Sequence, residues 1–377
     1  MRIAIVTLPL HTNYGGILQA YALQTVLEQM GHKVEHLQPR VEFPKLHPIW
    51  KMPLVWCKRL YRKYIKGESR LPIFTHPLKW IRKKTDVFII ENVKCRYIDQ
   101  KEWNICMQGG YDVVIFGSDQ VWRPLYAYPK TKYFGSFCID SNVKKIAFAT
   151  SFGTDVNEYS KELQNECAEL LKDFVAVSVR ENSAVDMCKT MFGVNAKHVL
   201  DPTLLLPKDE YIRLFQNKKT PKSDGDLVIS VLDESPEISA FVQKISEIGG
   251  LVPFRTNSKV EDYYDAPITE CQQPPVERWL RSFYDAELVI TDSFHACVFS
   301  IIFSKPFICI GNKKRGSARF ESLLSMFGLE DRLVTSFDDF EARKEDLMKG
   351  IDYGRVYAIL KEKRKESMDF LQKSLMK

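Results

Sequence analysis

Apolar runs and helical patterns alternate along the first half of the chain. Residues 2–8 (RIAIVTL) form a β-branched apolar run, and residues 17–31 place apolar side chains at helical spacing before a terminal glycine. Strands that alternate with helices predict βαβ units and a parallel sheet. Strands are expected at 32–37, 111–119, 144–152, 175–180 and 197–200, with helices at 159–174 and 181–193.

The same alternation restarts after a polar stretch at 216–226 (QNKKTPKSDGD), which has the composition of a linker. A charged helical pattern from 337 to 377 then ends the chain, and it would fold back across the first domain. The second half therefore predicts another doubly wound unit. Its strands are expected at 226–232, 251–255, 287–292 and 306–311, and its helices at 237–249, 276–286 and 293–303.

A chain of 377 residues is too long for one ordinary hydrophobic core. We expect an α/β protein with two Rossmann-like domains facing a cleft. The first would span 1–215 with a basic, mostly helical insertion at about 41–110, and the second 222–335, followed by a helical tail at 336–377. Ligands of such folds bind at the carboxyl ends of the strands, so the strand-to-helix junctions are the places to search.

Composition narrows the class of protein. A hydrophobic content of 45% with 27% charged residues is typical of a globular chain, and no stretch approaches the ~20 apolar residues of a membrane span. Residues 1–8 lack a signal-peptide cleavage pattern, so we expect a cytoplasmic protein. Nine cysteines without a CxxC pair and seven histidines without HxH or HExxH spacing predict no disulfide framework, metal site or cofactor.

Basic and aromatic residues crowd the insertion. This mixture suits an anionic lipid surface, which would place the protein at the inner face of the membrane. A solvated helical insertion explains the pattern equally well. No nucleic-acid-binding signature accompanies the charge, so no nucleic-acid partner is expected. The residues are Trp50, Lys51, Trp56, Lys58, Arg59, Leu60, Tyr61, Arg62, Lys63, Tyr64, Lys66 and Arg70, then Lys79, Trp80, Arg82, Lys83 and Lys84.

The first junction with candidate chemistry is HTNYGG at 11–16. Gly15 and Gly16 would let a ligand approach the backbone at a helix start, with Asn13 beside them, so an anion or a sugar hydroxyl is expected here. The spacing is not GxGxxG, and a tight turn alone would also need glycine.

The second junction is GSDQVW at 117–122. Asp119 is a candidate general base for a sugar hydroxyl, with Ser118 beside it. Trp122 would offer a stacking surface to a pyranose ring. Alternatively, Ser118 or Asp119 only caps a helix.

Arg180 closes a mostly apolar run, where a guanidinium suits a phosphate or carboxylate. A structural pair with Glu181 is the alternative, but neighbouring strand residues point to opposite faces, which favours Arg180 facing the cleft.

His295 lies in the first turn of a predicted helix, after Asp292 and Ser293. A lone histidine is more often a packed residue, but this one follows a strand end at the predicted cleft. A helix start disfavours the imidazolium unless an anion is close, and Asp292 or a bound phosphate would supply one.

A cationic stretch, NKKRGSAR at 312–319, follows the last predicted strand. Arg315 and Arg319 would clamp a polyanion there, or else contribute only surface charge.

Taken together, these motifs resemble the polysaccharide pyruvyl transferase family over about residues 1–330. The matching pieces are NYGGILQAYALQ, GSDQVW, SVRE, HVLDPTLLL and TDSFHACVFSIIFSKPFI, in this order. The resemblance implies a fold similar to B-type glycosyltransferases and a phosphoenolpyruvate donor whose pyruvyl group forms a ketal on a sugar. It further implies His295 as the catalytic acid and Arg180 as a donor ligand.

One departure concerns the run before the histidine. Relatives often carry an Arg-Leu-His-like sequence, whereas this chain has Ser293-Phe294-His295. Arg315 or Arg319 would supply the missing cation, with Ser293 at the donor. The expected partners are phosphoenolpyruvate and a sugar or lipid-linked oligosaccharide. The alternatives are a nucleotide-sugar glycosyltransferase of the same fold and a non-catalytic glycan- or lipid-binding protein.

Overall fold

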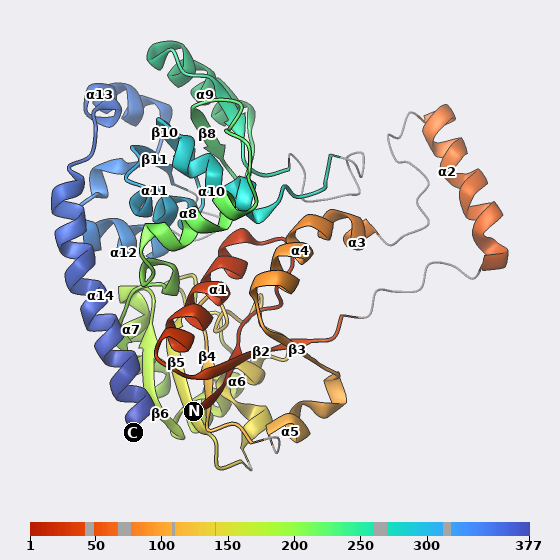
Figure 1. The fold of residues 1–377 in the computed structure, drawn as a ribbon, viewed down its shortest axis with the longest axis vertical. Helices are drawn as coiled ribbons and strands as arrows, with labels where there is room; N and C mark the ends of the chain where they lie inside the picture. The colour runs from red at the N-terminus through yellow and green to blue at the C-terminus, as the bar shows by residue number, and fades with distance from the viewer. Residues whose placement is uncertain (42–48, 67–76, 108–109, 140, 259–269, 312–317) are drawn as a thin grey trace.

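The computed structural model describes residues 1–41, 49–66, 77–107, 110–139, 141–258, 270–311 and 318–377 (Figure 1). Its larger sheet has seven parallel strands in the order β3-β2-β1-β4-β5-β6-β7. The strands are β1 (Arg2–Val6), β2 (Lys33–Pro39), β3 (Cys95–Ile98), β4 (Val113–Phe116), β5 (Lys144–Thr150), β6 (Phe174–Val179) and β7 (Lys197–His198).

A second parallel sheet contains five strands in the order β12-β11-β10-β8-β9. Two parallel sheets with crossover helices confirm the predicted pair of Rossmann-like domains. The strands are β8 (Leu227–Ser230), β9 (Pro253–Arg255), β10 (Leu288–Thr291), β11 (Phe307–Ile310) and β12 (Leu333–Val334).

Both faces of the larger sheet are buried, which explains why its strands are continuous apolar runs. Along β1, Ile3 and Ile5 join one hydrophobic core, whereas Ala4 and Val6 join another on the opposite face. The first core continues into the second domain, where it includes Val289 of β10. One face of each sheet therefore shares a single core, and this packing sets the position of one domain against the other.

Helices connect and cover the strands (Figure 1). The junctions that matter below are the starts of α1 and α11. The helices are α1 (Tyr14–Gln29), α2 (Met52–Lys66), α3 (Pro77–Ile81), α4 (Lys83–Asn92), α5 (Trp103–Cys106), α6 (Lys161–Leu171), α7 (Asn182–Phe192), α8 (Lys208–Asn217), α9 (Pro236–Gly249), α10 (Val276–Asp285), α11 (Phe294–Ile302), α12 (Ala318–Phe327), α13 (Phe337–Met348) and α14 (Tyr353–Met376).

The C-terminal helix α14 runs back along the first domain (Figure 1). Its Ser367 hydroxyl accepts a hydrogen bond from the Leu200 amide at 3.0 Å, and Arg364 Nε donates to the Leu204 carbonyl at 2.8 Å. These contacts tie the end of the chain to the segment that follows β7.

The insertion at 41–110 is less uniformly helical than its sequence suggests. It contains α2, α3 and α4, but it also contributes β3, which pairs in parallel with β2 at the edge of the sheet. Helix α2 stands apart from the rest of the molecule (Figure 1). None of the helices in the described part of the chain combines the length and apolar character that a bilayer crossing requires.

Candidate functional site

A cavity of about 410 Å³ lies where the carboxyl ends of strands from both sheets come together. The first domain contributes residues that follow β1 and β4, and the second contributes residues that follow β8, β9 and β10. This is the location expected for a ligand site in a doubly wound fold. Of the predicted site residues, Asn13, Gly15, Gly16, Asp119, Ser293, His295 and Arg319 line the cavity.

The imidazole of His295 sits against the start of helix α1. A Cβ atom added to Gly15 would lie 2.0 Å from His295 Nδ1, so only glycine allows this approach. Asn13 caps α1 by accepting a hydrogen bond from the Gly16 amide at 3.3 Å. The two predicted junctions, HTNYGG and TDSFH, are therefore brought into direct contact across the two domains.

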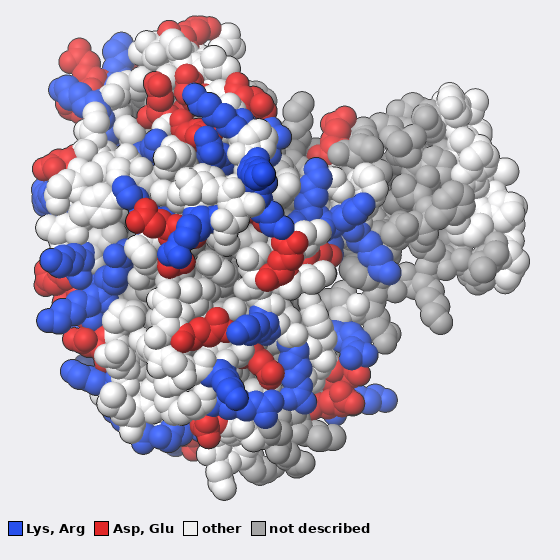
Figure 2. All heavy atoms as spheres, viewed as in Figure 1, with Lys and Arg blue, Asp and Glu red and all other residues white. Residues whose placement is uncertain are grey.

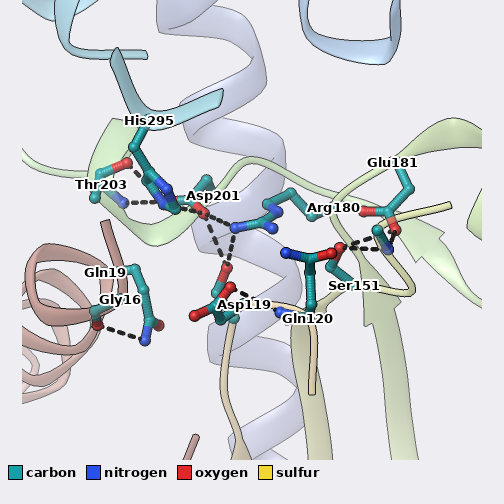
Figure 3. Close-up of polar contacts among 12 residues, drawn as sticks. Gly16, Gln19, Asp119, Gln120, Ser151, Arg180, Glu181, Asp201, Thr203 and His295 are labelled. Atoms are coloured by element: carbon teal, nitrogen blue, oxygen red, sulfur yellow. Dashed lines mark hydrogen bonds and ion pairs between the residues drawn. The ribbon is translucent and has the colours of Figure 1, made fainter. Parts of the chain in front are cut away.

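On its other side, His295 faces a buried carboxylate that the sequence analysis did not select (Figure 3). Asp201 Oδ2 lies 3.5 Å from His295 Nε2 and accepts hydrogen bonds from Arg180 Nη1 at 2.8 Å and from the Ser118 hydroxyl at 2.9 Å. The other oxygen accepts from the Thr203 amide and hydroxyl, at 3.0 and 2.6 Å. One carboxylate thus links both predicted functional residues.

Charge and burial act in opposite directions on Asp201. Burial alone would raise its pKa, but His295, Arg180 and the Thr203 hydroxyl together lower the pKa well below its usual range. The carboxylate therefore stays ionised. Burial likewise opposes the charge of Arg180, yet Asp201, Glu181 and Asp119 raise the pKa of that guanidinium.

Arg180 lies beneath the cavity rather than in its wall. Its side chain is 1% exposed, and its Cζ atom lies 4.5 Å from the ring centroid of Phe294, which does line the cavity. Nε and Nη2 of Arg180 have no hydrogen-bond partner among the described residues. Arg180 therefore contacts Asp201 and Phe294 from below the cavity. Direct contact with a donor remains a prediction.

Arg319, at the start of α12, is the predicted cation that lines the cavity. Burial, together with repulsion from Arg180, lowers its pKa to about 10, although Glu181 and Asp119 partly offset this effect. An anion in the cavity would stabilise both arginines. Arg315, the other predicted cation, lies outside the described residues.

Asp119 occupies a strained position at the cavity wall. Its φ of 89° is rare for a residue other than glycine, and its Oδ1 accepts a hydrogen bond from the Gln120 amide at 2.8 Å. A Cβ on Gly16 would lie 3.2 Å from Asp119 Oδ2, so the carboxylate is directed toward the start of α1. Ser118, by contrast, is fully buried and serves Asp201.

The prediction that Trp122 offers a stacking surface to a sugar is wrong. Trp122 is fully buried, and its ring stacks on that of Phe134 with the two ring centroids 5.1 Å apart. Its Nε1 donates a hydrogen bond to the Tyr133 carbonyl. The chain turns inward after Asp119, and this turn takes the indole into the second core. Tyr126, with 44% of its surface exposed, is the aromatic residue that this segment places at the cavity.

One further assignment differs from expectation, and it concerns the anion beside His295. The Asp292 carboxylate accepts hydrogen bonds from the amides of Leu232 and Asp233, so it holds the loop after β8, while Asp201 supplies the anion beside His295. The missed residue did carry a signal, because Asp201 directly follows the strand run KHVL and precedes a proline. Among the described residues, no cluster of His, Cys, Asp and Glu suits a metal ion.

The sequence of this chain is similar to one known protein family. The family model described as polysaccharide pyruvyl transferase matches residues 13–314. No curated protein sequence matches the chain.

Three solved structures are among those with a similar fold. UDP-GlcNAc 2-epimerase from Neisseria meningitidis, bound to UDP-GlcNAc, is 9% identical, with a TM-score of 0.58 over 99% of this chain and 100% of that one. UGT89C1 of Arabidopsis thaliana, complexed with UDP-L-rhamnose, is 8% identical, with a TM-score of 0.52 over 99% and 98%. UDP-N-acetylglucosamine 2-epimerase from Rickettsia bellii is 10% identical, with a TM-score of 0.51 over 100% and 97%. At these identities the likeness concerns the fold alone.

Proposed function

Because the chain belongs to the polysaccharide pyruvyl transferase family, we propose that it transfers a pyruvyl group from phosphoenolpyruvate to a sugar. The acceptor is a cell-surface polysaccharide or its precursor, the product is a pyruvate ketal, and phosphate is released. The observation that carries this proposal is the buried Asp201 carboxylate, which joins His295 to Arg180 at the cavity. This arrangement places the proposed acid beside a cavity that Arg319 also lines.

The donor requires cations because it carries a carboxylate and a phosphate on one carbon. Arg319 lines the cavity, and its lowered pKa indicates that an anion would stabilise it there. The amides at the start of α1 add partial positive charge beside the His295 imidazole, which the absent side chain of Gly15 admits to this position. Ser293 lies in the same wall. Arg180 acts through Asp201 and Phe294 and adds its charge from below.

In the first step, a sugar hydroxyl oxygen bonds to C2 of the donor. Asp119 accepts the hydroxyl proton, and protonated His295 gives its proton to the methylene carbon, which becomes a methyl group. The charge of Asp201, whose Oδ2 lies 3.5 Å from Nε2, stabilises the imidazolium. Positioned acid–base groups of this kind contribute roughly 10²–10⁴-fold to the rate.

In the second step, the C2–O bond to phosphate breaks and a second sugar hydroxyl bonds to C2. His295 recovers the proton held by Asp119 and passes it to the leaving phosphate, and it then takes the proton of the second hydroxyl. Two hydroxyl protons therefore end on the methyl group and on phosphate. Arg319 neutralises the charge that develops on the leaving group.

The acceptor occupies the outer part of the cavity in this scheme. Tyr126 offers a partly exposed ring at that wall, next to Asp119 and Gln120. Asn13, on the opposite junction, has an amide that can bind a hydroxyl. The alternative of a nucleotide-sugar glycosyltransferase shares the fold, so it has to be separated by ligand binding.

Thermal unfolding with millimolar phosphoenolpyruvate, beside a panel of UDP- and GDP-sugars, tests the donor. A ligand at 100 times its Kd stabilises the folded state by about 2.7 kcal/mol, so a clear upward shift in Tm is expected with phosphoenolpyruvate. Arg319→Met should abolish the shift, whereas Arg278→Met should keep it, because Arg278 pairs with Asp224 on the surface. A shift produced only by a nucleotide sugar would overturn the proposal.

A further inference from the structure

Helix α2 exposes apolar side chains that a water-soluble surface helix ordinarily buries. Leu54, Tyr64 and Ile65 are 70%, 72% and 68% exposed. No described residue of α2 is buried, and the helix stands away from both sheets (Figure 1). Much of the apolar side of α2 is therefore accessible to solvent.

The sequence of α2 separates apolar from basic positions around the helix. At about 100° per residue, Trp56, Leu60, Tyr64, Cys57, Tyr61, Leu54 and Ile65 follow one another around an arc of roughly 180°. The basic positions 58, 59, 62, 63 and 66 share an arc of roughly 140° on the other side. Only Val55 and Met52 interrupt the basic arc. One such face buries apolar surface while the other faces opposite charge.

Charge identifies the kind of partner. Residues 49–66 contain six basic residues and no acidic one. Lys79, Lys83 and Lys84 of the neighbouring α3 and α4 are also exposed, beside Trp80. Figure 2 shows lysine and arginine side chains gathered over α3 and α4. Tryptophan, tyrosine and lysine together favour the interface of an anionic bilayer, where the rings reach the acyl boundary and the ammonium groups meet phosphates.

This surface is joined to the rim of the cavity. The carbonyl of Ile81 in α3 accepts a hydrogen bond from the Gln273 amide at 3.1 Å, and Arg82 Nη2 donates to the Leu10 carbonyl at 3.2 Å. Gln273 and Leu10 both line the cavity. A membrane bound by this surface would therefore lie close to the cavity.

We propose that α2, together with α3, binds the surface of an anionic phospholipid membrane, with the apolar arc of α2 at the acyl boundary. This places the cavity at the membrane surface. The inference does not depend on pyruvyl transfer. Where the proposed function holds, the inference specifies that the acceptor is lipid-linked.

Cys57 provides a direct probe of insertion. It is exposed and lies within the apolar arc, and no other described cysteine is exposed. Burial raises the pKa of the Cys95 thiol to about 11, which disfavours its reaction at neutral pH. The full-length protein would be labelled with acrylodan and mixed with vesicles of phosphatidylcholine that contain about 30% phosphatidylglycerol. The anionic lipid gives the vesicles a negative surface potential, which attracts basic segments. A Cys57→Ser sample measures any labelling elsewhere.

We expect a blue shift of the dye and sedimentation with these vesicles, but not with pure phosphatidylcholine. Leu54→Glu/Ile65→Glu should reduce partitioning at least tenfold, whereas the matched surface pair Ile248→Glu/Val252→Glu should leave it within twofold. Raising the salt to about 0.5 M should weaken binding severalfold, because the Debye length shrinks well below 10 Å. Each of these proteins should melt like the wild type, since all four positions are exposed.

Equal partitioning of the wild type and Leu54→Glu/Ile65→Glu, or an absence of binding to anionic vesicles, would overturn the proposal. Dimers that dissociate in this variant, without vesicle binding, would assign the face to a second copy of the chain instead. Vesicle binding needs neither donor nor acceptor. If the proposed function is wrong, the phosphoenolpyruvate-dependent Tm shift is absent while membrane binding persists. If the membrane proposal is wrong, vesicle binding is absent while the Tm shift persists.

Discussion

Two of the cation–aromatic pairs in this molecule, one under the cavity and one in the insertion, differ in their surroundings and in their consequences. Beneath the cavity, Arg180 Cζ lies 4.5 Å from the ring centroid of Phe294, and Asp201 neutralises this guanidinium at 2.8 Å. In the insertion, Lys51 Nζ lies 4.7 Å from the ring centroid of exposed Trp50, and residues 49–66 around this pair include no acidic residue. Of these two pairs, the first is buried with a counter-charge, and the second is exposed in a stretch of sequence without acidic residues.

The difference shows that the counter-charge, rather than the cation, decides what each region can do. A buried guanidinium requires an anion, and the anion that satisfies it also positions His295. An exposed ammonium needs no partner for folding, so it remains available to an external surface. The following substitutions test that contrast, from the largest expected effect to the smallest.

His295→Ala should lower kcat for phosphate release by roughly 10²–10⁴-fold, because it removes the proposed acid. The protein should still unfold cooperatively, since the pair of Arg180 and Asp201 remains. His32→Ala, which alters a histidine far from the cavity, should stay within twofold of the wild-type rate. A wild-type rate in His295→Ala would exclude the acid role.

Asp201→Asn should reduce the free energy of unfolding by about 3–5 kcal/mol, because it leaves buried charges without their anion. The control is Asp346→Asn, which removes the partner of Lys349 on the surface and should cost less than about 1 kcal/mol. Urea denaturation measures both. Equal losses in the two variants would remove the distinction between the buried and exposed pairs.

The stability difference between the wild type and Asp201→Asn should also depend on pH. The pKa of Asp201 is lower in the folded chain than its unfolded value of about 3.9. Its stabilisation is therefore complete at neutral pH and is lost as the pH falls below the unfolded value. Urea denaturation of both proteins should show a large difference in the free energy of unfolding at pH 7 and a smaller difference below pH 4. A difference that stays constant with pH would contradict the assignment.

Gly15→Ala should displace the His295 imidazole, because the new Cβ would lie 2.0 Å from Nδ1. A displacement of about 1 Å can cost roughly 10²-fold in rate. Gly350→Ala is the control, since no atom lies within 4 Å of a Cβ built there. Steady-state phosphate release measures both, and an unaffected Gly15→Ala enzyme would show that the contact is unimportant.

Lys51→Glu/Lys58→Glu should change the free energy of unfolding by no more than about 0.5 kcal/mol, as is usual for exposed positions. The phosphoenolpyruvate-dependent Tm shift should also be retained, because neither residue lines the cavity. Urea denaturation and thermal unfolding measure these two properties. A loss above about 1.5 kcal/mol would mean that the basic segment supports the fold.

Periodicity predicted the fold because both faces of the larger sheet are buried, which makes its strands continuous apolar runs. Edge strand β3 was missed, since CRYI has two exposed residues and little apolar character. The polar residues at the strand-to-helix junctions correctly predicted that His295 and Asp119 lie at the cavity. They did not indicate how deeply each junction side chain is buried. Trp122 and Asp201 illustrate this gap, because their surroundings depend on turns and pairings that distant segments create.

The core shared by the two sheets bears on the modularity of this protein. Asp201 comes from one domain and His295 from the other, and their separation of 3.5 Å is set by packing that spans both domains. A chimera joined at 216–226 would therefore combine two folded halves from different proteins. The distance between the residues at the positions of His295 and Asp201 would then depend on an interface that has not been selected for it. Helix α14, which follows the second domain in the sequence, would also face a foreign first domain in place of its contacts to Leu200 and Leu204. For this reason, the whole chain is the smallest unit that can be exchanged between relatives without rebuilding the site.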